Sequence, residues 1–86
     1  MSPLQPYAEV RIVAIREDRF AGEKVFYRRL PRSGDVGTIV DTYVTPELAY
    51  EVECVDPNTG ETIWLDAMYP DEVEATPGSN VPLAHE

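Results

Sequence analysis

The feature that most restricts the fold is the stretch Gly34–Tyr43 together with the segment that follows it. Gly34 and Gly37 are three residues apart, and the residues after them are mainly β-branched and aromatic, as is typical of a strand. A glycine within a strand usually marks a bulge or a sharp bend. Beyond a short turn, the segment Ala49–Val55 shows the cleanest alternation of apolar and charged side chains in the chain. The two segments predict neighbouring strands of a small, strongly bent β-barrel.

Three other segments supply the rest of the predicted sheet. Ala8–Arg16 is predicted to be the first strand, and its apolar residues on both faces favour a strand that is covered twice. The loop Asp56–Gly60 is rich in turn-forming residues and is predicted to join Ala49–Val55 to a fourth strand, Glu61–Ala67. After a tight turn, Glu72–Ala75 is predicted to be a short closing strand.

These elements divide the 86 residues into one domain with two flanking segments. Residues 1–7 are predicted to be a proline-bearing leader, residues 8–75 the barrel, and residues 76–86 a flexible tail. Within the barrel, residues 17–33 form a long connection, and connections of this length are often functional. Its aromatic side chains are expected to fold back onto the barrel, and Val25–Arg28 could form a short strand or hairpin arm.

Charge is distributed unevenly along the chain, whose net charge is −9. All seven arginines and lysines lie in the first 32 residues, which also hold four acids and so carry a balance of +3. The remaining 54 residues contain twelve acids and no arginine or lysine. Two interpretations remain open: an acidic surface that steers a basic partner or pairs two copies, and a solvated surface that maintains solubility.

The cysteine content and the start of the chain favour the cytoplasm. Cys54 is the only cysteine and therefore has no partner for an internal disulfide. The segment Met1–Pro6 lacks the charged and apolar regions of a signal peptide. No apolar run approaches the length of a membrane span, so we expect no membrane association.

Five short strands, a long first loop and a tight turn before the last strand describe an all-β, SH3-like barrel. The motifs Gly34–Val40 and Tyr50–Glu53 resemble a short bacterial domain family of unknown function, with the pattern Gly-Asp-x-Gly-Thr-Val-Val followed by Tyr-Glu-Val-Glu-Phe. The similarity covers about residues 8–75. Leu30–Arg32 and Gly37 give a weaker likeness to the barrels of the nitrile hydratase β subunit and its small activator proteins. The glycine turn is also similar to the KOW motif of ribosomal and transcription-factor barrels. These resemblances imply a fold, and a fold alone does not imply a function.

Trp64 is the first candidate for a partner-binding residue. If Ile63, Leu65 and Ala67 point inward, alternation places Trp64 on the outer face of its strand. An exposed tryptophan beside polar residues is a common interface anchor. The alternative is that the first loop or the tail folds over it.

The first loop supplies the other candidate binding residues: Phe26, Tyr27, Arg28 and Arg29. Aromatic side chains interleaved with cations can stack on bases and contact phosphates. The acidic remainder of the chain would repel a polyanion, so nucleic-acid binding is a minor hypothesis. The alternative is an arm whose aromatic side chains pack and whose arginines pair with the acidic barrel.

No motif points to catalysis or to a metal. Cys54 is in phase with Tyr50 and Val52, which predicts a buried core thiol. The Gly-x-x-Gly turn enters a strand rather than a helix, which argues against a phosphate loop. No calcium or magnesium spacing is present, so a cluster of four acids near the end of the barrel is predicted to be a solvated face. Its members are Asp66, Asp71, Glu72 and Glu74.

The sequence therefore predicts a non-catalytic protein-interaction module without a cofactor or a small-molecule substrate. Its predicted binding surface is Trp64 with Phe26 and Tyr27, and its partner is another protein or a second copy in a homodimer. A second hypothesis is an accessory or activator protein that binds a metalloenzyme subunit such as that of nitrile hydratase. A third is nucleic-acid binding through the basic, aromatic first loop.

Overall fold

The computed structural model describes residue 4, residues 7–18, residue 20 and residues 28–77. Within these residues, five antiparallel strands form one sheet in the order β4-β3-β2-β1-β5. The strands are β1 (Glu9–Ile12), β2 (Val36–Tyr43), β3 (Ala49–Val55), β4 (Thr62–Met68) and β5 (Val73–Ala75). Two single turns of 3-10 helix accompany them, η1 (Arg16–Asp18) and η2 (Pro70–Glu72). The all-β fold class is confirmed, and the arrangement is consistent with a small β-barrel.

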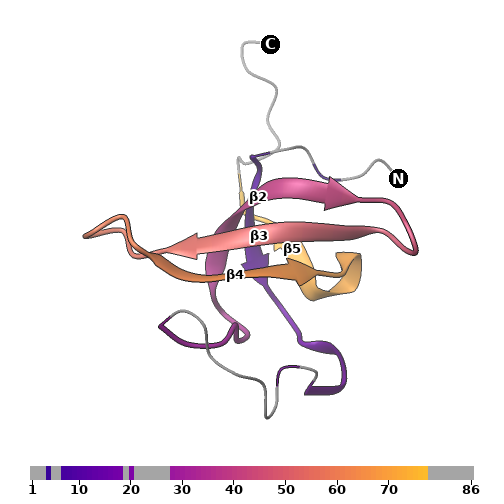
Figure 1. The fold of residues 1–86 in the computed structure, drawn as a ribbon, viewed down its shortest axis with the longest axis horizontal. Coiled ribbons are helices and arrows are strands. Elements are labelled where there is room, and N and C mark those ends of the chain that lie inside the picture. Colours follow the sequence, from indigo (N-terminus) through magenta and orange to yellow (C-terminus); the bar gives the residue numbers. More distant parts are fainter. Residues whose placement is uncertain (1–3, 5–6, 19, 21–27, 78–86) are drawn as a thin grey trace.

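Strand β2 connects two differently oriented parts of the sheet. In Figure 1, β3 and β4 run across the view, β1 runs up and down it, and β2 curves from one direction to the other. The register of β2 against β3 shifts between Ile39 and Asp41, so the extra residue is Val40. A bulge increases the bend and twist of its strand. The glycines of this segment were expected to mark a bulge or a sharp bend, and the bulge lies at Val40 rather than at Gly37.

Gly37 is required for close packing instead. A Cβ atom at this position would lie 2.7 Å from the Glu53 carbonyl oxygen and 2.7 Å from Val52 Cγ1. At position 34, glycine is favoured for a different reason: the φ angle is +97°, which residues with a side chain rarely adopt. Gly34 is therefore needed for the turn, and Gly37 is needed for the close contact between β2 and β3.

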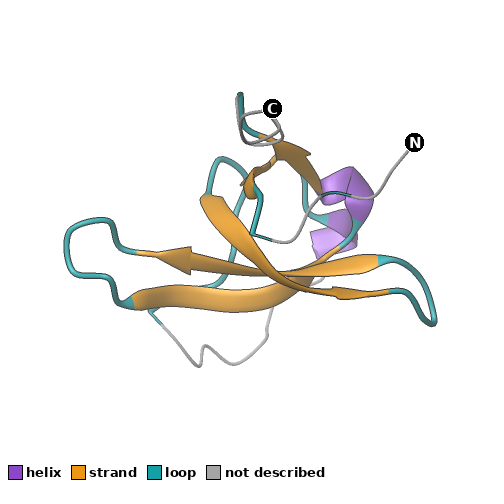
Figure 2. Cartoon of the chain, turned by 90° about the horizontal axis from the view of Figure 1, so that it is seen from above, coloured by secondary structure: helices purple, strands orange, loops and turns teal. Residues whose placement is uncertain are grey.

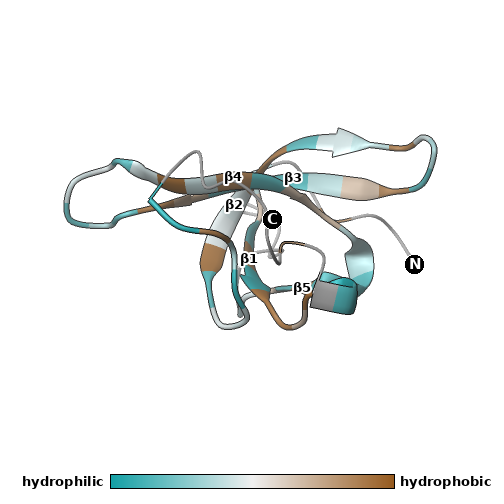
Figure 3. Cartoon of the chain, turned by 60° about the horizontal axis from the view of Figure 1, so that its bottom comes forward, coloured by the Kyte–Doolittle hydropathy of each residue, from teal (hydrophilic) through white to brown (hydrophobic). Residues whose placement is uncertain are grey.

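The inner face of the sheet holds the hydrophobic core. Its buried strand residues are Val10, Ile12, Ile39, Tyr50, Val52, Cys54, Trp64, Met68 and Val73. Phe20 joins them from the first connection, as was expected for the aromatic side chains of that segment. Hydrophobic and hydrophilic residues alternate along the strands in Figure 3, which is the pattern of a sheet with one buried face.

The first strand is shorter than predicted, and the segments on either side of the barrel are only partly described. Strand β1 ends at Ile12, and Val13 is exposed, so the predicted double coverage of a longer first strand is wrong. Leu4 packs against the core, and its N–H donates a hydrogen bond to the Tyr50 hydroxyl at 3.0 Å. Residues 25–27, for which a short strand was considered, and residues 78–86 of the predicted tail lie outside the described residues.

The two 3-10 turns, drawn in purple in Figure 2, are connected by a hydrogen bond from the first residue of η1 to Glu72, the last residue of η2. One oxygen of this buried carboxylate accepts a hydrogen bond from the Arg16 backbone N–H at 2.7 Å. The other accepts one from the Tyr69 backbone N–H at 2.9 Å. Glu72 was predicted to belong to a solvated face, and this prediction is wrong because its carboxylate satisfies two backbone donors.

Candidate functional site

Trp64 lies on the inner face of β4, opposite Cys54, and its side chain is 1% exposed. The prediction that it faces outward is wrong, and a side chain in this position cannot be an exposed interface anchor. Met68 shares its face, whereas Ala67 is exposed and Leu65 is half-buried. Three apolar residues at odd positions suggested the opposite orientation. The buried face of β4 is instead decided by the pairing of Trp64 with Cys54 and by the large volume of the Trp64 and Met68 side chains.

Asp35 explains why tryptophan is accommodated in this interior. Its Oδ2 accepts a hydrogen bond from Trp64 Nε1–H at 2.8 Å. The Arg29 guanidinium makes two further bonds to the carboxylate, both 2.8 Å long, and the Arg32 N–H makes one of 3.1 Å. Burial opposes ionisation of Asp35, but the hydrogen bonds from Arg29, Trp64 and Arg32 outweigh it and hold its pKa below the ordinary value. The Gly-Asp-x-Gly motif is therefore structural.

The predicted binding residues of the first loop are only partly described. Phe26 and Tyr27 lie outside the described residues. Arg28 pairs with Asp56 at 2.9 Å, and Arg29 pairs with Asp35. Both arginines pair with acids of the loops next to β2 and β3, as the alternative interpretation of this segment expected. Contact of these residues with a partner stays a prediction.

The remaining candidate for chemistry is Cys54, which is buried as predicted. Burial raises the pKa of its thiol, with a smaller contribution from the Asp35 charge, so the protonated form is favoured. In the part of the chain that the structure describes, no group of three His, Cys, Asp or Glu side chains is arranged to hold a metal ion. No helix of this part is long and apolar enough to cross a membrane.

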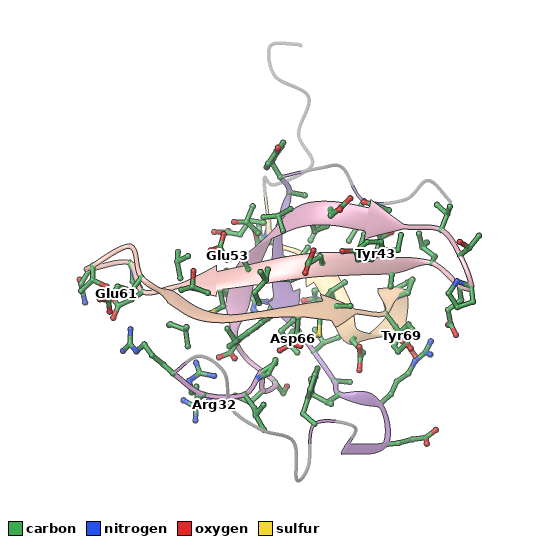
Figure 4. All side chains as sticks on the ribbon, in the orientation of Figure 1. Arg32, Tyr43, Glu53, Glu61, Asp66 and Tyr69 are labelled. Atoms are coloured by element: carbon green, nitrogen blue, oxygen red, sulfur yellow. The ribbon has the colours of Figure 1, made fainter. Side chains whose placement is uncertain are left out.

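A groove of about 330 Å³ lies at the end of the sheet where β2 meets the β2–β3 loop. Its lining consists of Tyr43, Thr45, Pro46, Glu47, Ala49 and Tyr69, and we call it the tyrosine groove. Ala49 lies opposite Tyr43 and is 8% exposed, and it does not belong to the core cluster that contains Tyr50, Val52 and Cys54. Figure 4 shows Tyr43 and Tyr69 at the same end of the sheet, with Glu61 at the other end.

The Arg16 side chain contacts both the β2–β3 loop and the segment around η2, which line the tyrosine groove. Its guanidinium carbon lies 4.0 Å from the centre of the Tyr69 ring, within cation–π range. Its Nε lies 2.9 and 3.2 Å from the two Asp71 carboxylate oxygens, and its Nη1 lies 3.3 Å from Glu47 Oε2. The loop between β2 and β3 is thereby joined to the segment around η2.

Carboxylates also surround the Tyr43 side of the groove. The Tyr43 hydroxyl donates a hydrogen bond to Glu51 Oε1 at 2.7 Å, and this bond raises the pKa of Tyr43. Asp41 lies directly opposite Glu51 in the register of β2 and β3. Sequence reasoning missed the groove, although both tyrosines stand at strand ends near a proline, Pro46 or Pro70.

The described residues thus define a small antiparallel β domain with an aromatic, acidic groove and no assembled catalytic group. The chain belongs to a family described as a domain of unknown function (DUF4926), whose profile matches residues 11–75. This finding confirms the resemblance to a family of unknown function. None of the curated proteins and none of the solved structures compared with the chain gave a match.

Proposed function

We propose that this chain is a non-catalytic protein-interaction module with an SH3-like barrel, and that the tyrosine groove is its binding surface. The observation that carries the proposal is the groove itself. Two tyrosines and a proline line it, and Tyr43 and Pro46 are exposed. Tyrosine is enriched at interfaces because it offers a large contact area with a polar end.

The strand order supports the barrel assignment. Strand β1 pairs with both β2 and β5, β2–β3–β4 follow as a meander, and a single 3-10 turn precedes β5. Trp64 is not part of the proposed surface, because its side chain is buried. We place the module in the cytoplasm, in agreement with its single, unpaired and buried cysteine, Cys54.

The test is affinity capture from a native bacterial extract with three baits: the wild type, Tyr69→Ala and Tyr7→Ala. Tyr7 is a matched control because it is an exposed tyrosine that does not line the groove. We expect one stoichiometric protein, identified by mass spectrometry, to be lost with Tyr69→Ala and retained with Tyr7→Ala. Binding of the purified partner to the three baits then confirms a direct contact. A partner that all three baits retain would contradict the proposed surface.

The same capture separates the alternatives by the mass of what is bound. A metalloenzyme subunit would identify an accessory protein, and a protein of the bait's own mass would identify self-association, which light scattering checks independently. For nucleic acid, no specific observation favours binding, because Arg28 and Arg29 are paired with carboxylates. A salt-sensitive shift of RNA or DNA at low ionic strength would revive that hypothesis.

A further inference from the structure

We propose that the tyrosine groove binds a lysine or arginine side chain on an extended peptide segment of a partner protein. This inference rests on the proposed function and names the chemistry that the groove recognises. The volume of about 330 Å³ is near the lower end of ligand pockets, which span roughly 300–1,000 Å³. A groove of this size suits one or two side chains of a peptide.

The lining of the groove suits a long cationic side chain. Ala49 and Pro46 supply apolar surface against which a methylene stem can lie. Tyr43 supplies an exposed aromatic ring, whose face attracts cations, whereas Arg16 already lies over the ring of Tyr69. Lysine and arginine combine both features, an apolar stem and a charged end.

The negative charges around the groove favour a positively charged ligand. Glu47 lines the groove, Glu51 is hydrogen-bonded to Tyr43, and Asp41 lies directly opposite Glu51. Like charges directly opposite each other in a sheet are destabilising. A cation from a partner relieves this repulsion, whereas an acidic segment increases it.

Arg16 shows within the molecule that these groups hold a cation. Its guanidinium lies over the Tyr69 ring and pairs with Asp71 and Glu47. Glu47 is the more weakly held partner, at 3.3 Å, and its side chain is exposed. The Glu47 carboxylate therefore has remaining acceptor capacity for a second cation that enters the groove.

The experiment uses three fluorescent heptapeptides of one sequence frame on the full chain. The basic probe is Gly-Ala-Lys-Ala-Arg-Ala-Gly, the neutral one has glutamine at both charged positions, and the acidic one has glutamate there. We expect the basic peptide to bind about tenfold more tightly than the neutral one, as one added charged contact predicts, and more weakly at high salt. Amide chemical shifts are expected to change at Ala49, Glu51 and Tyr69.

Variants separate the groove from general charge attraction. Glu47→Gln is expected to reduce the affinity for the basic peptide about three- to tenfold, because it removes a carboxylate from the lining of the groove. Glu61→Gln removes an exposed carboxylate at the opposite end of the sheet and is expected to leave binding unchanged (Figure 4). Equal effects of the two variants, or equal binding of basic and neutral peptides, would overturn the inference.

Two further outcomes distinguish this inference from the proposed function. Spermidine that binds as tightly as the basic peptide would overturn the peptide as occupant. A groove-dependent partner in the capture experiment, with no preference for the basic peptide, would overturn only the cationic ligand. A capture without any groove-dependent partner would overturn the proposed function.

Discussion

Two clusters at opposite ends of β3 are built from the same kinds of groups, and they differ in burial. One combines Trp64, Asp35 and Arg29, and the other combines Tyr69, Asp71 and Arg16. The carboxylate of Asp35 is 9% exposed, whereas that of Asp71 is 64% exposed. Buried polar groups are costly to leave unpaired, and exposed ion pairs contribute little. The first cluster therefore maintains the fold, whereas the second contributes little to it and remains exposed to solvent.

The largest expected effect is that of Trp64→Ala. Loss of a fully buried indole should reduce the free energy of unfolding by about 3–5 kcal/mol. Urea denaturation followed by far-ultraviolet circular dichroism measures it, because the variant lacks tryptophan fluorescence. In comparison, Tyr69→Ala should cost about 1 kcal/mol or less. Similar losses for the two variants would break the distinction between the clusters.

Asp35→Asn comes next, at about 2–3 kcal/mol near neutral pH, since it breaks a buried charge pair whose arginine is one-third exposed. The folded-state pKa of Asp35 is lowered, so its contribution is complete above about pH 4 and is lost as pH falls through the folded-state pKa. Denaturation curves at several pH values should show wild type and variant converging in acid. A pH-independent difference would mean that the carboxylate charge is not what stabilises the fold.

Glu72 and Asp71 are adjacent residues, and they provide a second contrast between a buried and an exposed carboxylate. Glu72→Ala removes the acceptor of two backbone N–H groups and should cost about 1–3 kcal/mol. Asp71→Ala removes an exposed partner of Arg16 and should cost about 0.5 kcal/mol or less. Thermal unfolding of the two variants side by side is the measurement. A larger effect for Asp71 would assign a structural role to the exposed cluster.

Arg16→Ala should have little effect on stability, because the ion pairs of its side chain are made with exposed carboxylates. Its backbone N–H, which donates to Glu72, is retained in the variant. Urea denaturation monitored by Trp64 fluorescence measures the change. A loss of several kcal/mol would show that the side chain of Arg16 holds η1 against η2.

Much of the strand pattern was predictable from local sequence. Ala49–Val55 is strand β3 with its predicted bounds, and Gly60, whose φ is +78°, lies in the predicted hairpin loop. Strand β4 occupies the predicted region, but its faces were assigned the wrong way round. The register of β3 against β4 shifts between Cys54 and Val55, close to the loop that joins the two strands. Alternation of residues within one strand cannot detect such a shift.

The proposed binding surface was much less predictable. Trp64 and Glu72 were expected on the surface, yet hydrogen bonds to Asp35 and to two backbone donors let both residues lie in the interior. Tyr43 and Tyr69 are 26 residues apart in the chain and meet in one groove only because β2 and β4 flank β3. No local pattern carries that information.

The all-β class, the family and the positions of the turns could be inferred from the amino-acid sequence, because periodicity, turn-forming residues and motifs are local properties. The three-dimensional fold decided which face of β4 is buried and which tyrosines share a groove. It also decided which carboxylates are neutralised by arginines, as Asp35 is by Arg29. Those properties depend on strand register and on contacts between distant residues, and burial then sets whether an ion pair stabilises the fold or stays available for binding.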